Sequence, residues 1–586
     1  MHYALCIMNP TSPKHQTKGD PPMPNMKITR PQFPSLFGGL GFHNSEWHFY
    51  RLTEKEHFDQ KLAKCYHEIS PAFMRTFGGF SDWSKDSMDT FADYYERMQK
   101  VTDTPIYLAS AMGKQHFCDE ERWEYAQKVA EKLDYLINER NVKQIRYYCF
   151  SNELSCANHG VLKKNMDLFK TYHTHLYRAF QNRELYVGLL STDESCTPPW
   201  TTIDYAINEM SSITEDFCTH HYVSSHDIYS LEFYDWFRKH CLDCVMKCIR
   251  CNGAAGKRLI IGEFGFKSGE GKNDIKESSY CFLPGVIKDV TNYNYNGEGA
   301  YAALAYTEGA LAAINAGVLN LVYWTYSDYP DPYVCHYAEN DEYAKEWGKA
   351  ERYISQTQDT KYNKCGLMKW EDDGDYSVRE MYWCLGIVTK YMKRNSKVLD
   401  VDCGDYMLRS AALLHKDGNV SITIVNRAKE KKELRLNLAI KHAEDLQPFK
   451  VYEYDSHNVP MNEFGDLQDE SARISLDDEL NLTYTLLPES VTVFTTDYID
   501  RPDVYATNVK FDKNKNMLTW NAVNDKLHCY YRVYRGETAD FVPSKENQIA
   551  STIATTLGFG ARYLKESAIR NVKGDYFKVM SINKKK

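Results

Sequence analysis

The stretch "IRYYCFSNE", residues 145–153, is a run of β-branched and aromatic residues that ends on a glutamate, Glu153. A second stretch, "RLIIGEFGF" at residues 258–266, has the same form and places Glu263 after an apolar run. Such runs predict buried strands. One glutamate at a strand end is usually a helix-capping or loop residue. Whether the two glutamates belong to one site therefore depends on how the fold arranges these two strands.

Six further apolar runs occur between Pro34 and Asp328, and longer amphipathic segments such as residues 56–69, 121–140 and 300–317 separate them. Eight strands that alternate with helices predict an eightfold (β/α)8 TIM barrel. The alternative is a doubly wound sheet, but "LFGGLGFHN" lacks the G-x-G-x-x-G spacing expected after the first strand of that fold. The six runs are "LFGGLGF" (36–42), "AFMRTFGG" (72–79), "PIYLASAMG" (105–113), "LYVGLLS" (185–191), "DFCTHHYVS" (216–224) and "VLNLVYWTYS" (318–327).

The pattern changes after the barrel, so the chain is predicted to have several domains. Residues 33–395 form the barrel and a connecting region, and residues 396–500 form an antiparallel β-sandwich with a hairpin turn at "KDGN". Residues 1–32 are a candidate for an added strand of that sandwich. In residues 501–586, "NMLTWNAV", "YYRVYRG" and "DYFKVMSIN" resemble strands of a fibronectin type III module, with Trp520 as its core tryptophan.

Composition excludes some partners and suggests a compartment. The net charge is −9 over 586 residues and no Lys/Arg-rich face stands out, so no nucleic-acid partner is expected. No apolar run approaches about 20 residues, so no membrane span is expected. The N-terminal "MHYALCIMNP" lacks the basic start of a secretory signal, and 17 cysteines, an odd number, suggest reduced thiols. A cytoplasmic location follows, and a homo-oligomer remains open.

The active site of such a barrel lies at the carboxyl ends of its strands. There Glu153 from the fourth strand and Glu263 from the seventh are predicted to face each other across one bowl. His220 rather than His221 is expected to point into it, because side chains alternate along a strand. The predicted site residues are His43, Arg75, Asn152, Glu153, His220, Tyr222, Glu263 and Trp324.

Two carboxylates across such a bowl are suited to glycosidic bond cleavage. If Arg75 and the Tyr222 hydroxyl reach Glu263, that carboxylate stays ionised and is the nucleophile. Glu153, expected in a drier setting, is then the general acid and afterwards the base.

The other residues are expected to bind the sugar. Asn152 can hydrogen-bond the 2-hydroxyl, and Trp324 offers a flat face to the apolar side of a pyranose. His43 is as well explained by a structural role as by a sugar contact. Trp83 and Trp200, in loops after the second and fifth strands, are weaker candidates for the wall of the cleft.

The motifs "SNE", "GEFG", "HHYVS" and "VYWTYSD" resemble those that close strands 4, 7, 6 and 8 of clan A retaining glycoside hydrolases. The sandwich that ends in "LLPESVTVFTT" resembles the accessory sandwich of families 39, 30 and 51, and family 39 is the nearest. The resemblance implies double displacement with net retention, no metal or other cofactor, and β-glycosides or α-L-arabinosides as substrates. A small saccharide, attacked from its end, is the expected partner.

Two other functions remain open at this point. One is a non-catalytic carbohydrate-binding scaffold, and the other is a transglycosidase that uses the same residues with a sugar or alcohol as acceptor. The identity of the sugar depends on loop contacts, which the sequence does not define.

"HCLDCVMKCIRC" has a spacing that suggests a metal site, with cysteines at 241, 244, 248 and 251. The segment is predicted to be a helix, in which the first and last cysteine would lie about 15 Å apart at ~1.5 Å rise per residue. Zinc needs its sulfur ligands within about 4 Å of one another. A packing face is therefore the preferred interpretation.

Overall fold

The computed structural model describes most of the chain. The described residues are 25–32, 35–44, 46–50, 55–78, 83–100, 103–110, 118–155, 162, 164–195, 201–224, 231–250, 256–267, 300–330, 362–363, 366–369, 377–455, 457–559 and 574–584.

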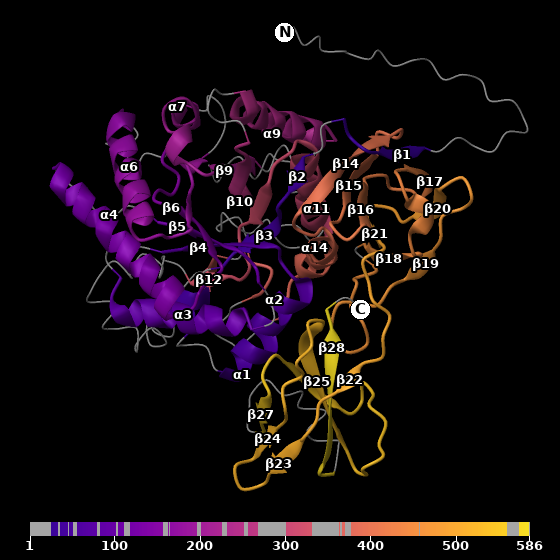
Figure 1. Ribbon diagram of the computed structural model, residues 1–586. Coiled ribbons are helices and arrows are strands. Elements are labelled where there is room, and N and C mark those ends of the chain that lie inside the picture. Colours follow the sequence, from indigo (N-terminus) through magenta and orange to yellow (C-terminus); the bar gives the residue numbers. More distant parts are fainter. Residues whose placement is uncertain are drawn as a thin grey trace, which may run out of the picture.

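A parallel sheet closes into a barrel within residues 39–323, which confirms the predicted fold (Figure 1). The fifth strand is split into two short pieces, β7 and β8, of which β7 pairs with β6 and β8 pairs with β9. The ring is closed through this split strand. Its members are β3 (Gly39–His43), β4 (Phe73–Phe77), β5 (Ile106–Ala109), β6 (Ile145–Cys149), β7 (Gly188–Leu189), β8 (Glu194–Ser195), β9 (Phe217–Ser224), β10 (Leu259–Lys267) and β11 (Asn320–Tyr323).

Helices cover the outside of the ring because each has an apolar stripe to bury. In α3, for example, the Ser84 side chain caps the amino end, and Phe91, Tyr94, Tyr95 and Met98 are buried. The helices are α1 (Lys55–His57), α2 (Ala63–Ile69), α3 (Lys85–Met98), α4 (Asp119–Asp134), α6 (Met166–Asn182), α7 (Thr201–Glu209), α9 (Phe233–Arg250), α11 (Ala300–Asn315) and α14 (Glu380–Tyr391), with the short turns η1 (Glu46–Phe49), η2 (Phe58–Leu62), η3 (Tyr135–Glu139) and η5 (Ser211–Ile213).

A ten-stranded sheet, in which most strand pairs are antiparallel, follows the barrel, and the N-terminal segment contributes a strand to it. Strand β1 runs antiparallel to β14 and parallel to β17. Apolar residues such as Ile424, Leu436 and Phe494 form its core. The strands are β1 (Met26–Thr29), β2 (Leu36–Phe37), β14 (Ser396–Cys403), β15 (Leu408–Leu414), β16 (Val420–Asn426), β17 (Lys432–Ala439), β18 (Phe449–Tyr454), β19 (Ala472–Ile474), β20 (Asn481–Leu486) and β21 (Ser490–Thr495), with the turn η10 (Ala443–Asp445).

The C-terminal unit is a small pair of antiparallel sheets around Trp520, Tyr531 and Val579. The expected core tryptophan is 6% exposed. The resemblance to a fibronectin type III module stays a prediction. The strands are β22 (Val504–Tyr505), β25 (His528–Gly536), β26 (Gln548–Thr552) and β28 (Tyr576–Asn583) in one sheet, and β23 (Lys510–Asp512), β24 (Met517–Thr519) and β27 (Thr556–Gly558) in the other. A separate pair, β12 (Tyr329–Pro330) and β13 (Tyr362–Asn363), lies beyond β11.

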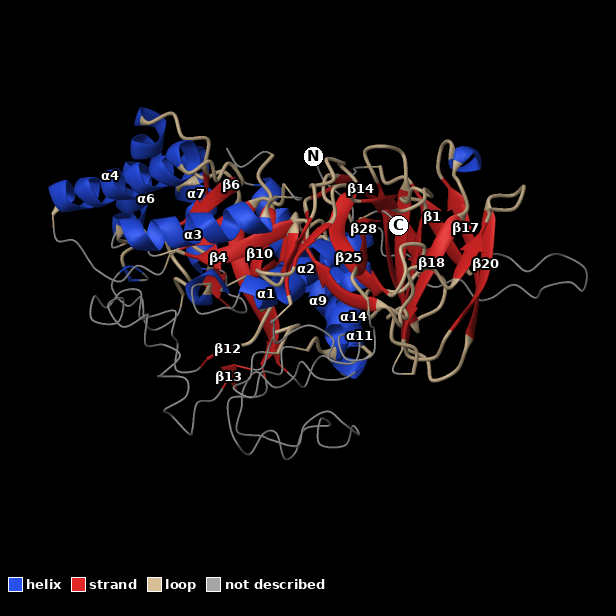
Figure 2. Cartoon of the chain, turned by 90° about the horizontal axis from the view of Figure 1, so that it is seen from below, coloured by secondary structure: helices blue, strands red, loops and turns tan. Residues whose placement is uncertain are grey.

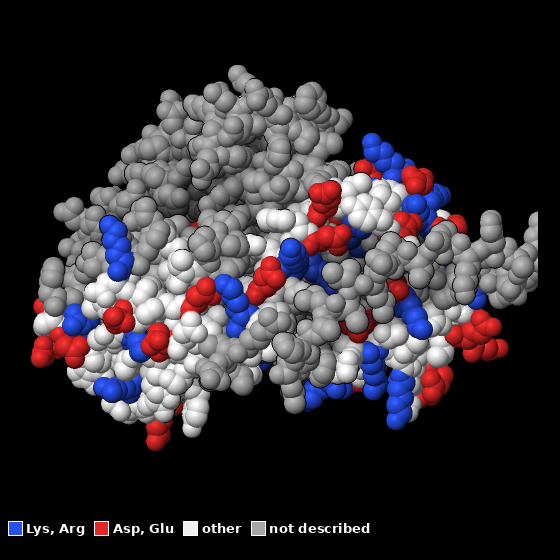
Figure 3. All heavy atoms as spheres, turned by 90° about the horizontal axis from the view of Figure 1, so that it is seen from above, with Lys and Arg blue, Asp and Glu red and all other residues white. Residues whose placement is uncertain are grey.

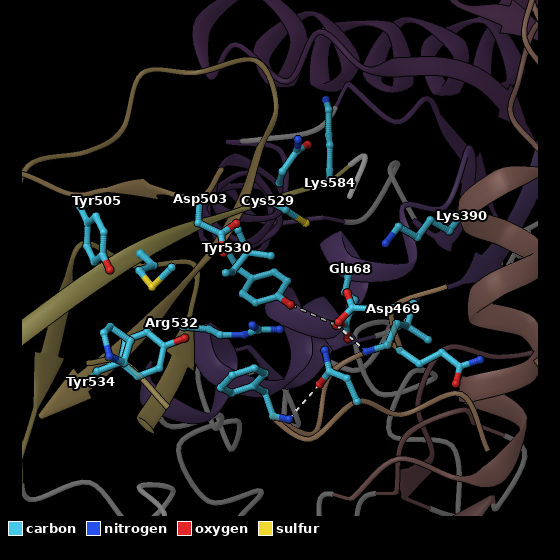
Figure 4. Close-up of a pocket in the computed structure, with 18 of the residues that line it drawn as sticks. Glu68, Lys390, Asp469, Asp503, Tyr505, Cys529, Tyr530, Arg532, Tyr534 and Lys584 are labelled. Carbon is cyan, nitrogen blue, oxygen red and sulfur yellow. Dashed lines mark hydrogen bonds between the residues drawn. The ribbon is translucent and has the colours of Figure 1, made fainter. Parts of the chain in front are cut away.

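The three units are packed against one another. Helices α11 and α14 lie between the barrel and the sandwich, and α3, α4 and α6 lie on the opposite side of the barrel (Figures 1 and 2). Arg427 and Arg409 of the sandwich form ion pairs with Glu308 of α11. The C-terminal unit packs beneath α2, where Tyr530 and Arg532 of β25 line a cavity of about 280 Å³ (Figure 4).

On the face seen in Figure 3, acidic and basic side chains alternate over the described surface, and neither sign forms a continuous patch there. None of the described helices is both long enough and apolar enough to cross a bilayer.

Candidate active site

Strand register brings the predicted residues to one end of the barrel. His43 of β3 lies beside Arg75 of β4, and Arg75 lies beside Tyr107 of β5. On the other side of the ring, Glu263 of β10 lies beside His220 of β9. Asn152 and Glu153 follow the end of β6. The described side chains among those that the sequence predicted therefore meet above the apolar interior of the barrel.

Arg75 is fully buried and organises this end of the barrel. Its Nη1 atom donates to Glu263 Oε1 at 2.5 Å and lies 2.9 Å from His43 Nδ1. Its Nη2 atom donates to Asn152 Oδ1 and, at 3.2 Å, to Asp193 Oδ2. Because Asn152 Oδ1 is occupied by Arg75, its amide –NH₂ is the end left to bind a substrate oxygen.

The two glutamates are held near one another by His220. Its Nδ1 atom lies 3.6 Å from Glu153 Oε1 and 3.5 Å from Glu263 Oε2. Since both distances start from one atom, these oxygens are at most about 7 Å apart. Retaining glycosidases place their carboxyl groups roughly 5–5.5 Å apart, and inverting ones roughly 6.5–9.5 Å. This bound on one pair of oxygens admits the retaining separation.

The burial of the two glutamates is the reverse of the sequence expectation. The side chain of Glu153 is 26% exposed and that of Glu263 is 4% exposed. Glu263 lies within β10, which continues to Lys267, whereas Glu153 lies beyond the end of β6. The prediction that Glu153 occupies the drier setting is therefore wrong, because the position relative to the strand end sets the burial.

Asp193 belongs to the site and was not predicted from the sequence. Its carboxylate is fully buried, and its Oδ2 atom accepts from His220 Nε2 at 2.8 Å as well as from Arg75. Asp193 comes two residues after the apolar run "LYVGLLS", so its place after a predicted strand was the available signal. Both Asp193 and Glu153 have left-handed backbones, with φ of 49° and 52°. Such backbone strain in non-glycine residues clusters at functional sites.

Electrostatics in the cluster follow from burial and from charge pairing. Burial alone would lower the pKa of His220, but the charges of Asp193 and Glu263 outweigh it and raise that pKa to about 10. Burial opposes ionisation of Asp193, yet His220 and Arg75 hold its pKa below the usual range. Burial raises the pKa of Glu263, and His220 and Arg75 act against that rise. Two cations thus face the buried carboxylates Asp193 and Glu263.

The lack of a side chain at Gly262 lets strand β10 pass close to the cluster. A Cβ atom on Gly262 would lie 3.0 Å from the Tyr107 ring and 3.2 Å from Asp193 Oδ1. Glycine before Glu263 therefore lets β10 pass against Tyr107 and Asp193 without displacing them.

Aromatic side chains border the site. The Trp324 ring lies 4.3 Å from the ring of His43, which in turn lies 4.6 Å from Phe77. Trp324 is partly exposed and His43 is fully buried, so the tryptophan is the one of the two with a face open to a ligand. His43 is in contact with both Arg75 and Trp324.

The sequence also predicted that His220 and Tyr222 point into the bowl, and that two loop tryptophans could line the cleft. His221 packs outward against Phe237 and His240 of α9, so His220 is the inward histidine. Tyr222 lies in β9 opposite Gly265, but its side chain is outside the described residues. Of the weaker aromatic candidates, Trp83 is buried against Trp47, and Trp200 is outside the described residues.

The cysteine segment forms a packing face. Cys241, Cys244 and Cys248 lie on α9 and are fully buried, and Cys251 is outside the described residues. Among the described residues, the group with metal-ligand spacing is the exposed set His442, Glu444 and Asp445, which does not include them.

Comparison with known proteins finds solved structures with a similar fold, but no match by sequence. No family model matches the chain. No curated protein matches it by sequence. The fold is similar to the GH51 arabinofuranosidase from Xanthomonas axonopodis pv. citri (TM-score 0.53, 12% identity, 80% of this chain and 99% of that chain covered). It is also similar to the α-L-arabinofuranosidase from Thermotoga maritima (TM-score 0.53, 11% identity, 80% and 99% covered) and to a GH30 endoxylanase from Clostridium papyrosolvens C71 (TM-score 0.50, 12% identity, 80% and 99% covered).

At such identities the likeness establishes the fold, a TIM barrel followed by a β-sandwich. Families 30 and 51 are two of the three whose accessory sandwich the sequence resembles. The nearer resemblance to family 39 stays a prediction. The chain thus has the architecture of these glycoside hydrolases and, at the carboxyl end of its barrel, two facing glutamates.

Proposed function

We propose that the protein is a retaining glycoside hydrolase with Glu263 as nucleophile and Glu153 as general acid and base. The observation that carries the proposal is the position of both carboxylates within 3.6 Å of the single atom His220 Nδ1. Two carboxyl groups at this spacing can act on opposite sides of one anomeric carbon.

The environments of the two glutamates support these roles. Glu263 is buried and accepts a hydrogen bond from Arg75 at 2.5 Å, which favours the ionised form needed for attack. Glu153 is partly exposed at the rim, where it can give a proton to a leaving group and later take one from water. Exposure suits this second role, since water must reach Glu153 in the hydrolytic half of the reaction.

The mechanism then has two half-reactions. In the first, Glu263 bonds to the anomeric carbon while the bond to the leaving oxygen breaks and Glu153 gives that oxygen its proton. In the second, Glu153 takes a proton from water, which attacks the anomeric carbon and releases Glu263. In this proposal the Asn152 amide group binds the sugar beside the reacting carbon, and the Trp324 face packs on its apolar side.

The substrate class belongs to the same proposal. The xylanase and arabinofuranosidase activities named for the structural neighbours, together with the motifs, favour β-xylosides, other β-glycosides and α-L-arabinofuranosides. Action at the end of a short saccharide and a cytoplasmic location rest on the sequence alone.

A panel of aryl glycosides tests the proposal. We expect turnover of at least one β-glycoside or α-L-arabinofuranoside, and proton NMR of the first-formed product should show the configuration of the substrate. A matching 2-fluoro glycoside should leave its label on Glu263, located by mass spectrometry of peptides. First-formed product of inverted configuration, or a panel without any turnover, would contradict the proposal.

A further inference from the structure

His220 is held between one buried carboxylate and the two proposed catalytic carboxylates. Its Nε2 atom lies 2.8 Å from Asp193 Oδ2, so this nitrogen carries a proton that it donates. The 3.3 Å between His220 Nε2 and Arg75 Nη2 is then a contact between two donors that share the same oxygen of Asp193.

The opposite nitrogen faces negative charge. If the ring were neutral with its proton on Nε2, the Nδ1 lone pair would lie near oxygens of Glu153 and Glu263, which are 3.6 Å and 3.5 Å from Nδ1. A second proton on Nδ1 converts this repulsion into attraction toward both glutamates. The geometry therefore selects the imidazolium form, with a donor located between the two carboxylates.

The proposed reaction moves one negative charge between these carboxylates. Before the first half-reaction Glu263 is ionised and Glu153 is protonated. After it, Glu263 is bonded to the sugar and Glu153 is ionised, and the second half-reaction reverses the change. A fixed donor at similar distances from both can stabilise the charge on either one without reorganisation.

We propose that Asp193 is a positioning residue that keeps His220 doubly protonated, so that His220 Nδ1–H stabilises the charge on Glu263 and on Glu153 in turn. This inference rests on the proposed function for its kinetic consequence, but the protonation of His220 is independent of any substrate.

Charged and titratable groups from every neighbouring element face His220. Glu263 comes from β10, Glu153 from the segment after β6, Arg75 from β4 and Asp193 from between β7 and β8. The charges of Asp193 and Glu263, with the hydrogen bonds to Asp193 and Glu153, outweigh the burial of the ring and raise the pKa of His220 to about 10.

The direct test is the protonation state of His220 in the unliganded protein. Nitrogen-15 histidine spectra of the whole chain, assigned by the loss of signals in His220→Gln, should show imidazolium shifts up to about pH 9. In Asp193→Asn the same signals should titrate at least two pH units lower. A neutral His220 at pH 8 in the unsubstituted protein, or an unchanged titration in Asp193→Asn, would overturn the inference.

Kinetics supply the second test. Asp193→Asn should slow both half-reactions by about 10²-fold, the effect of removing one positioned donor from a developing charge. The first half-reaction is followed by kcat/KM on substrates with poor leaving groups, and the second by kcat on 2,4-dinitrophenyl glycosides. The alkaline limb of activity should also move to lower pH. Loss confined to one half-reaction, with an unchanged pH profile, would argue against a donor that serves both carboxylates.

Asp216→Asn is the matched control. Asp216 is a buried aspartate just before β9, at the opposite end of the barrel, and its carboxylate pairs with Arg258 at 2.9 Å. This variant should lose stability but keep the pH profile and the His220 signals. If Asp193→Asn does not fold, Asp193→Ser, which also removes the charge, takes its place.

The outcomes separate this inference from the proposed function. If Glu263 and Glu153 variants lose activity while His220 titrates as an ordinary histidine, only the role of Asp193 fails. If no glycoside is turned over but His220 stays cationic through Asp193, the pairing stands and the proposed function fails.

Discussion

Two buried ionic clusters in this molecule are built from similar groups and differ in whether a partly exposed carboxylate lies beside them. The cluster at the carboxyl end of the barrel joins Arg75 and His220 to Asp193 and Glu263. The other joins the barrel to the domains that follow it, at the cavity shown in Figure 4. There Lys64 pairs with Glu68 and Asp466, and Arg532 pairs with Asp466.

In the interdomain cluster every carboxylate oxygen has a close donor. Glu68 Oε2 accepts from Lys64 and from the Tyr382 hydroxyl, and Oε1 accepts from the Leu467 amide at 2.9 Å. In the barrel cluster, Glu263 Oε2 lies 3.5 Å from His220, and the neighbouring Glu153 is partly exposed. A buried network of this kind fixes a structure. A carboxylate that reaches solvent, as Glu153 does, is accessible to a substrate.

Glu263→Ala should give the largest effect and would break the barrel cluster at the proposed nucleophile. We expect turnover to fall by roughly 10⁵-fold or more, as when other covalent nucleophiles are removed. Azide should restore activity on activated glycosides and give a product of inverted configuration. Glu194→Gln is the control, because Glu194 is a buried carboxylate on the same rim that caps α7 through the Ile203 amide. Equal loss in both variants would count against a specific role for Glu263.

Glu153→Gln should have the next largest effect. Removing the proton donor should slow substrates with poor leaving groups by about 10²- to 10⁴-fold. With a dinitrophenyl leaving group the first half-reaction needs no proton, so the covalent intermediate should still form and then accumulate. Rapid-mixing measurement of a burst of dinitrophenolate checks this. A uniform loss over all leaving groups would remove Glu153 from the acid role.

Asp466→Ala should break the other cluster and affect stability instead of catalysis. It leaves Lys64 and Arg532 buried without their shared partner, which costs about 3–5 kcal/mol. Chemical unfolding of the whole chain measures the change. At temperatures where the variant is folded, kcat should be unchanged; a large fall in kcat would mean that the two clusters are coupled.

Glu46→Gln should give the smallest effect, and one that depends on pH. Burial raises the pKa of Glu46 to about 7 from 4.5, so the folded state resists its ionisation. The unsubstituted protein is therefore penalised progressively as pH rises from 4.5 to 7, and the variant is not. We expect no gain in stability at pH 4 and a gain of up to about 3 kcal/mol at pH 8. The difference between unfolding curves at the two pH values checks it.

Sequence patterns predicted the parts of the site that are local to a strand. Glu153, Glu263, Arg75 and His220 each stand at or near the end of an apolar run, and alternation along β9 separated His220 from His221. Asp193 was missed because the fifth strand is split into β7 and β8, which leaves it in an irregular segment between them. The apolar run of residues 185–191 gave no sign of that division.

The sequence by itself determined the alternation of strands and helices, the closed barrel that follows from it, and the presence of a glutamate in or just after two of its strands. These are local properties, since periodicity and side-chain type act over a few residues. Only the tertiary structure decided that Glu263 is the drier carboxylate, that Asp193 joins His220, and that Lys64 meets Asp466 402 positions away. Burial and charge pairing depend on groups that the closed fold brings together from different strands and domains, and no local pattern encodes those distances.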